Sequence, residues 1–152
     1  MIEGADKYTS LFDLWVLSHR VRSIIDDRLT DSGLSADDFA MYSLCAGQGP
    51  STPKQLAQWV GVRPSTLSAY ISRMDARGHL RRIPNPADGR SFLVDLTDGG
   101  WKALELASAS YLVLVAEVEQ ELPIPTEILR ESLAQLDRAV RTAAQRRGGS
   151  MT

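Results

Sequence analysis

Two short stretches near the middle of the chain carry polar side chains suited to contacting a polyanion. In the first, Arg63 is followed by Ser65, Thr66 and Ser68, and in the second Arg90 stands at the end of a run of turn residues. Arginine binds phosphate oxygens and guanine edges, and serine and threonine hydroxyls hydrogen-bond phosphates or bases of either kind. These residue types predict binding to nucleic acid rather than covalent chemistry.

The balance of charge changes sign along the chain. Residues 51–97 hold seven basic and three acidic residues, whereas the remainder holds ten basic and 16 acidic residues. The net charge of −2 therefore conceals a basic middle, which predicts a local site for a polyanion on a chain that otherwise repels one. A basic surface that is merely solvated explains the same counts.

Signals for enzymes, metals and membranes are weak in this sequence. Ser51 and Lys54 fit an S-x-x-K spacing, but the companion motifs of that enzyme class are missing. The two histidines lie far apart, and the single cysteine allows no internal disulfide. No apolar run approaches the length of a membrane helix, and the acidic residues 1–6 do not resemble a signal peptide. We therefore expect a cytoplasmic protein that is not an enzyme and needs no metal or cofactor.

Helix start and stop signals place the first polar stretch at the beginning of a helix. Thr52 and Gln55 form a capping box that opens one helix, and Gly61 ends it. Pro64 suits the first turn of the next helix, which Gly78 stops. The positions of this second helix that would enter a major groove are Arg63, Pro64, Ser65, Thr66, Ser68 and Ala69.

A hairpin is predicted after these two helices. Leu80–Pro84 and residues 91–96 have the alternating pattern of strands, and residues 85–90 are rich in turn formers. Two short helices, a tight turn and a hairpin with a basic tip predict a winged helix-turn-helix over about residues 35–97.

Long amphipathic helices are predicted on both sides of this region, over about residues 8–30 and 98–145. Their apolar residues cover more than one face, which favours burial against a second chain, although a monomer core is the simpler alternative. The predicted fold class is mainly α (α+β), with one domain over residues 1–145 and a disordered tail over residues 146–152.

In the order helix, helix, short strand, helix-turn-helix, wing and two long helices, the sequence resembles the MarR family of bacterial transcriptional regulators. The most specific string is Asp-Gly-Arg-Ser-Phe-Leu-Val-Asp-Leu-Thr over residues 88–97, which is similar to the wing signature of that family. Residues 65–68 and the stretch from Arg73 to Leu80 are similar to its recognition helix and the strand that follows.

The resemblance implies a homodimer that binds a pseudo-palindromic operator in double-stranded DNA, most often as a repressor released by a small molecule. It also implies that Arg90 enters the minor groove and that Asp88 orients it. Narrow A·T-rich minor grooves attract arginine because their potential is strongly negative. The sequence departs from the family at Ala69, where an arginine is frequent, and at Arg63, which replaces a small capping residue.

Further residues are candidates for phosphate contacts or for an effector pocket. Lys54, Arg73 and Arg77 are the candidates for phosphates, with a solvated surface as the alternative for each. Residues that could line an effector pocket between the dimerisation helices and the DNA-binding lobe are Trp15, His19, Arg22, Tyr42 and Tyr111, although core or surface roles explain them as well. Cys45 lies in an apolar helix without a basic neighbour, so we expect an inert thiol.

An alternative function is a winged-helix module that binds another protein and no DNA. The basic tip at Arg90 and the polar face that begins at Arg63 argue against it. A gel-shift with DNA from beside the gene would separate the two hypotheses.

Overall fold

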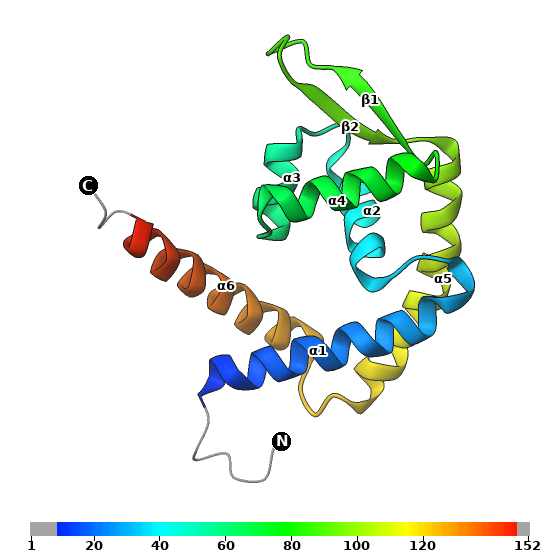
Figure 1. Ribbon diagram of the computed structural model, residues 1–152. Helices are drawn as coiled ribbons and strands as arrows, with labels where there is room; N and C mark the ends of the chain where they lie inside the picture. The colour runs from blue at the N-terminus through cyan, green and yellow to red at the C-terminus, as the bar shows by residue number, and fades with distance from the viewer. Residues whose placement is uncertain (1–8, 149–152) are drawn as a thin grey trace. The chain divides into compact units, whose positions relative to one another are not determined.

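The computed structural model describes residues 9–148. The chain divides into two compact units, one ending at Leu114 and the other beginning at Val115. The first unit contains most of the secondary structure: α1 (Ser10–Leu29), the 3₁₀ turn η2 (Thr30–Ser32), α2 (Ala36–Gln48), α3 (Pro53–Val60), α4 (Pro64–Ala76), β1 (Leu80–Pro84), β2 (Phe92–Leu96) and the larger part of α5 (Asp98–Glu121) (Figure 1). The second unit contains the end of α5 and α6 (Thr126–Gly148).

Local signals explain where the helices begin. Thr9 caps α1 by accepting from the amide of Phe12, and Ser35 caps α2 by accepting from the amide of Asp38. At the start of α5 the hydroxyl of Thr97 accepts from the amide of Gly100 and donates to the carbonyl of Gly78. This last pair of hydrogen bonds ties the base of the hairpin to the end of α4.

The sheet consists of one antiparallel pair. Leu80 lies opposite Leu96 at its base, and Pro84 lies opposite Phe92 toward the tip. The short strand expected before the helix-turn-helix appears as a single bridge, in which the backbone of Ser51 exchanges two hydrogen bonds with that of Val94. The predicted strands are confirmed, the second beginning one residue later than expected.

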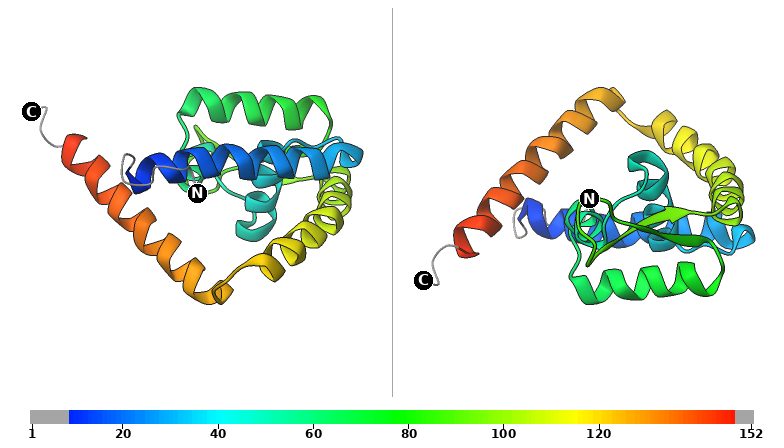
Figure 2. Two further views of the ribbon diagram at one scale, coloured as in Figure 1. Left: turned by 90° about the horizontal axis from the view of Figure 1, so that it is seen from below. Right: turned by 90° about the horizontal axis from the view of Figure 1, so that it is seen from above.

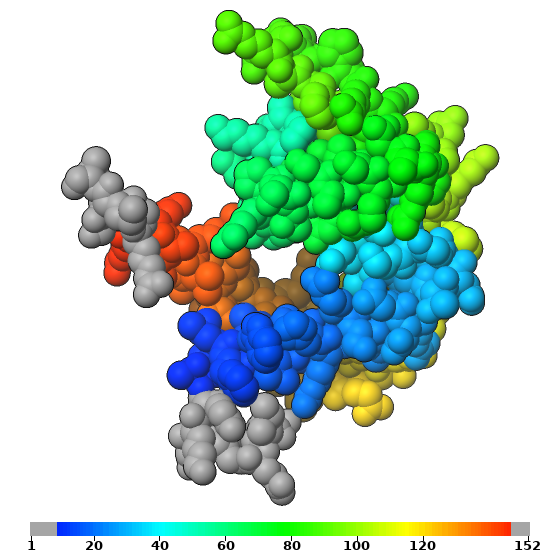
Figure 3. Space-filling model, viewed as in Figure 1, coloured from blue at the N-terminus to red at the C-terminus, as the bar shows by residue number. Residues whose placement is uncertain are grey.

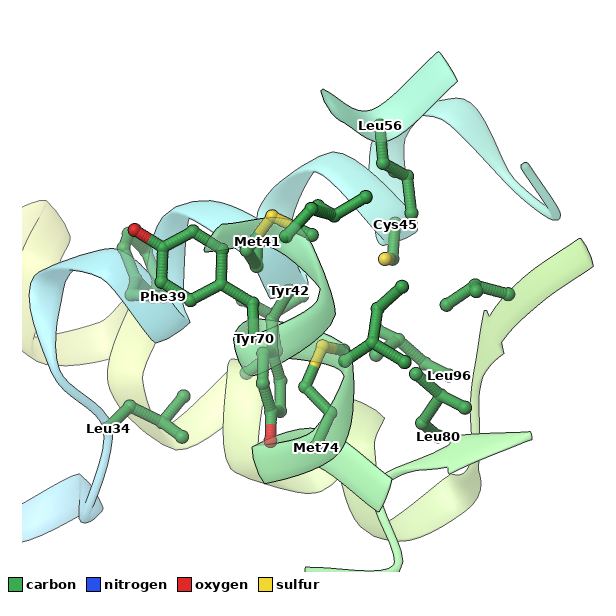
Figure 4. Close-up of a cluster of buried hydrophobic side chains, with 14 of the residues drawn as sticks. Leu34, Phe39, Met41, Tyr42, Cys45, Leu56, Tyr70, Met74, Leu80 and Leu96 are labelled. Carbon is green, nitrogen blue, oxygen red and sulfur yellow. The ribbon is translucent and has the colours of Figure 1, made fainter. Parts of the chain in front are cut away.

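The core of the first unit lies between α2, α3, α4 and the hairpin (Figure 4). Tyr42, Met74 and Leu56 have no exposed surface, and Leu80 and Leu96 close the core from the strands. The side chains that Figure 4 labels are Leu34, Phe39, Met41, Tyr42, Cys45, Leu56, Tyr70, Met74, Leu80 and Leu96. This core holds α4 and the hairpin together as one body.

The long terminal helices keep much apolar surface exposed. On α1, Trp15 is 58% exposed, and on α5 Leu112 is 64% exposed. In the second unit, Ile128 and Val140 of α6 are also exposed. Within residues 9–148 no helix has the length and apolar character needed to cross a membrane.

The winged-helix fold with long terminal helices agrees with the expectation from sequence. The last helix is longer than expected, because α6 continues to Gly148, so residues 146–148 are helical where a tail was predicted. Residues 149–152 of that predicted tail lie outside the described residues.

Candidate nucleic-acid interface

The start of α4 is set by the helix before it and by one glycine. Thr52 and Gln55 form the predicted capping box of α3, with Pro53 in its first turn. Gly61 ends α3 with φ +74°. Residues other than glycine adopt this backbone conformation only at a cost in free energy. Val62 and Arg63 then complete the turn, and α4 begins at Pro64.

One side of α4 is buried and the other is open. Leu67, Tyr70, Ile71 and Met74 pack into the core. The predicted groove-facing set is entirely exposed, and it consists of Arg63, Pro64, Ser65, Thr66, Ser68 and Ala69. Both views of Figure 2 place α4 at the outer edge of the first unit, and the space-filling view shows its green surface open to solvent below the projecting hairpin (Figure 3). The fold therefore presents a helix face that a groove can receive.

Hydrogen bonds within the hairpin tip fix its backbone. The carboxylate of Asp88 accepts from the backbone amide of Arg90 at 3.0 Å, and the Asn85 side chain donates to the hydroxyl of Ser91 at 2.7 Å. Asp88 thus orients Arg90 through the backbone, and the guanidinium of Arg90 is left exposed.

Arg73 and Arg77, two candidates for phosphate contacts, form ion pairs with Asp38, although their own side chains remain 42% and 36% exposed. Arg73 donates from Nε and Nη2 to Oδ1 of Asp38 at 3.1 and 2.8 Å, and Arg77 donates to Oδ2 at 2.9 Å. Asp38 is only 3% exposed. The sequence alone did not indicate this cluster, because the two arginines lie 35 and 39 residues away from Asp38 along the chain.

Two further arginines of the basic middle are also paired. Arg81 donates to Asp95 across the hairpin at 2.9 Å, and Arg82 donates to Asp75 at 3.2 Å while its guanidinium lies over the ring of Phe92. Of the seven basic side chains between residues 51 and 97, those without an ion pair or hydrogen bond in the described structure are Lys54, Arg63 and Arg90. The cations available to a polyanion are therefore fewer than the sequence suggests.

The five residues considered for an effector pocket have unlike surroundings. Tyr42 is fully buried, and its hydroxyl lies 2.9 Å from Nδ1 of His79. Arg22 forms an ion pair with Asp37, whereas Tyr111 packs its ring against Phe39 with centroids 4.8 Å apart. On the exposed face of α1, Trp15 and His19 contact each other edge to face. Tyr42 is part of the core and is closed to a ligand in this conformation.

A surface hollow lies elsewhere, between α3 and α4. Its volume is about 540 Å³. Its lining includes Lys54 and Gln58 from α3 and Leu67 and Ser68 from α4.

One cysteine remains to be placed among the residues that the structure describes. Cys45 is buried, and burial with the nearby charge of Asp95 raises the pKa of its thiol to about 11. The part of the chain between residues 9 and 148 contains no cluster of three potential metal-binding side chains from histidine, cysteine, aspartate or glutamate.

Two packed helices, an exposed second helix and a hairpin with an exposed arginine define a winged helix-turn-helix protein. A model of the MarR family matches residues 32–91, which cover α2 to the hairpin tip. Over this region the chain is therefore similar to the MarR family of transcriptional regulators.

Individual relatives extend the similarity to most of the chain. An HTH-type transcriptional regulator of Mycobacterium bovis is 28% identical over 105 residues, which cover 69% of this chain and 73% of the relative. The multiple antibiotic resistance protein MarR of Escherichia coli is 27% identical over 104 residues, 66% of this chain and 72% of that protein. The crystal structure of the M. tuberculosis regulator MosR in complex with DNA superimposes with a TM-score of 0.79 and 24% identity, covering 90% of this chain and 98% of that one.

Proposed function

We propose that this protein is a sequence-specific regulator that binds double-stranded DNA as a homodimer, with α4 in the major groove and Arg90 in the adjacent minor groove. The observation that carries the proposal is the joint exposure of Arg63, the polar face of α4 and Arg90, all on one body and none ion-paired within the described residues. The structurally similar regulator MosR has been crystallised in complex with DNA, which supports DNA binding by a chain of this fold.

The chemistry of the two arginines assigns them different roles. Arg63 precedes Pro64 at the N-terminus of α4, where the helix dipole and free amides also favour a phosphate. Arg90 stands on a turn whose backbone is already fixed by Asp88, so it loses little freedom when it enters a groove. Ser65 and Thr66 accept or donate hydrogen bonds to base edges, and they discriminate bases less sharply than an arginine at Ala69 would.

The proposed interface makes few contacts with phosphate. Three uncommitted cations in each protomer give six in a dimer, so log Kd should change with log salt concentration by a slope of about 5 or less. Phosphate contacts by Arg73 and Arg77 as well would raise the slope to about 9.

The experiment is a titration of duplex DNA from beside the gene, followed by footprinting. The wild-type protein should protect a two-fold symmetric site whose half-sites lie about one helical turn apart. The double substitution Arg63→Ala and Arg90→Ala should abolish the footprint and leave the protein folded, whereas Arg141→Ala on α6 should leave the footprint unchanged. An unchanged footprint in the double variant would reject these site residues, and absence of binding by the wild type would favour a protein-interaction module.

The homodimer is supported by the apolar surface of the terminal helices. Leu112 is 64% exposed on α5, and Leu17 is 52% exposed on α1. Monomers seldom leave such surfaces to water over several turns. Light scattering should give twice the chain mass for the wild type, and Leu112→Glu should shift the protein toward the monomer, whereas Gln58→Glu on α3 should not.

We also propose that a small molecule releases this regulator from DNA, as expected from the family resemblance. Such a ligand must bind the free conformation more tightly than the DNA-bound one. Its effect would be measured as weaker operator binding at a fixed protein concentration. A compound that binds equally well with and without operator would not be the effector.

A further inference from the structure

The DNA-binding lobe contains a buried negative charge at Asp38. Asp38 lies in the first turn of α2 and is 3% exposed, and its two carboxylate oxygens accept from Arg73 of α4 and from Arg77, the residue that caps the end of α4. Arg73 and Arg77 stand one helical turn apart, so both project to the same side of α4. Asp38 therefore holds the recognition helix at two successive points.

This arrangement differs from the exposed ion pair between Arg82 and Asp75. Arg81 also donates from Nε and Nη2 to a buried carboxylate, that of Asp95, but this pair joins the two strands of the hairpin and does not involve α4. Arg82 and Asp75 are each about half exposed and touch through one hydrogen bond of 3.2 Å. Asp38 instead accepts three hydrogen bonds, two of them from Arg73 as a fork. Charge-assisted bonds of forked geometry constrain direction as well as distance. Such a contact resists rotation of α4 about its own axis, whereas the apolar contacts of Leu67 and Met74 are less directional.

The rotation of α4 about its axis matters because the residues proposed to contact bases lie at its N-terminal end, whereas the contacts with Asp38 lie at its C-terminal end. Ser65 and Thr66 are two turns before Arg73, and a helix transmits a rotation along its whole length as a rigid body. A small rotation would move both hydroxyls out of reach of the bases that they contact.

We propose that Asp38 is a positioning residue for DNA recognition: by holding Arg73 and Arg77 it sets the rotation of α4 and keeps these two arginines off the phosphates. The proposal rests on the DNA-reading role of α4 proposed above. It makes a prediction whose sign is opposite to that of simple electrostatics. Removal of a negative charge near DNA should strengthen binding through the electrostatic term, but removal of a positioning contact should weaken specific binding.

The test uses Asp38→Asn, which keeps the size of the side chain, and Asp75→Asn as the matched control on an exposed pair. Each full-length protein is titrated with a duplex that the wild type selects from a random pool, and with a scrambled duplex of the same composition. Asp38→Asn should weaken binding to the selected duplex by about tenfold or more and leave binding to the scrambled duplex unchanged or stronger. Asp75→Asn should leave the ratio of the two affinities unchanged.

A second variant distinguishes positioning from phosphate contact. Arg73→Gln removes one ion pair of Asp38 and keeps the other, with Arg77. It therefore disturbs the fold less and replaces Asp38→Asn in the experiment if that variant does not fold. It should weaken specific binding without changing the salt slope, whereas loss of a phosphate contact would lower the slope by about 0.9 for each contact. A lower slope, or tighter binding of the selected duplex by Asp38→Asn, would overturn the proposal.

Hydrogen exchange provides a readout that needs no DNA. In Asp38→Asn the amides of α4 should exchange faster than in Asp75→Asn, because the ion pairs that join α4 to α2 are lost. Equal exchange in the two variants would overturn the inference even if the wild type binds DNA. If the wild type binds no duplex, the proposed function fails, and the exchange of α4 still decides whether Asp38 positions this helix.

Discussion

The guanidinium of Arg22 on α1 donates to the carboxylate of Asp37 on α2 at 2.6 Å. Both side chains remain in contact with solvent, with 54% and 29% of their surfaces exposed. The next residue, Asp38, points into the protein toward α4. The first turn of α2 thus joins α1 by an exposed ion pair and α4 by a buried one, and the two should contribute differently to stability.

The exposed pair is expected to contribute little. Water and salt screen it, and two long side chains lose freedom when it forms, so a double-mutant cycle with Arg22→Gln and Asp37→Asn should give a coupling of about 0.5 kcal/mol. The measurement is urea unfolding of the four proteins in low salt and in 1 M NaCl, where the coupling should shrink. A coupling of several kcal/mol that salt leaves unchanged would contradict this.

The ion pairs of the buried Asp38 should make the free energy of unfolding depend on pH in the acid range. Burial alone raises the pKa of Asp38, but the hydrogen bonds and charges of Arg73 and Arg77 outweigh it and lower this pKa below its usual 3.8. Because the pKa is lower in the folded state, ionised Asp38 stabilises the fold above a pH of about 4, and this contribution is lost as the pH falls further.

Asp38→Asn should therefore cost on the order of 2 kcal/mol at pH 7 and less as the pH falls below about 4. The free energy of unfolding by urea, measured for both proteins from pH 7 to pH 3, gives this difference directly. Asp75→Asn serves as the control, with an expected change of less than about 1 kcal/mol at pH 7 because its pair is exposed. A cost that stays constant down to pH 3 would show that the charge of Asp38 is not what stabilises the fold.

Cys45 should be unreactive in the folded protein. Its side chain is 1% exposed, and burial with the charge of Asp95 raises the pKa of the thiol to about 11, so the thiolate is scarce at pH 8. Alkylation by iodoacetamide, followed by mass spectrometry, should be slow in buffer and complete in urea. Dilute peroxide should leave the thiol of Cys45 unoxidised, which peptide mapping measures, and rapid labelling without urea would contradict the buried position.

The boundaries of α3 were predictable from sequence because their causes are local. The capping box of Thr52 and Gln55 and the stop at Gly61 each depend on residues within four positions, and the structure confirms them. The exposed face from Arg63 to Ala69 was predictable for the same reason, since the helical period separates it from Leu67 and Tyr70.

The partners of the charged residues could not be predicted in this way. Arginine is a residue type usually found at the surface, and only the packing of α4 on α2 brings Arg73 and Arg77 to Asp38. Tyr42 likewise looks suited to a pocket until the fold places its hydroxyl beside His79 in the core. Contacts between residues more than 30 positions apart depend on the tertiary structure, which a single sequence does not reveal by spacing.

Gly61 and Gly47 offer a matched pair for the turn that sets the angle of the recognition helix. A Cβ atom at either position would meet no atom within 4 Å, so space does not distinguish them. Gly61 has φ +74°, where alanine is strained, and Gly61→Ala should lower the free energy of unfolding by about 1 kcal/mol. Gly47 lies near the end of α2 without a positive φ, and Gly47→Ala should raise it by about 0.5–1 kcal/mol because alanine favours the helix. Urea unfolding of both variants measures this difference in sign, and equal shifts would mean that the conformation at Gly61 carries no strain for alanine.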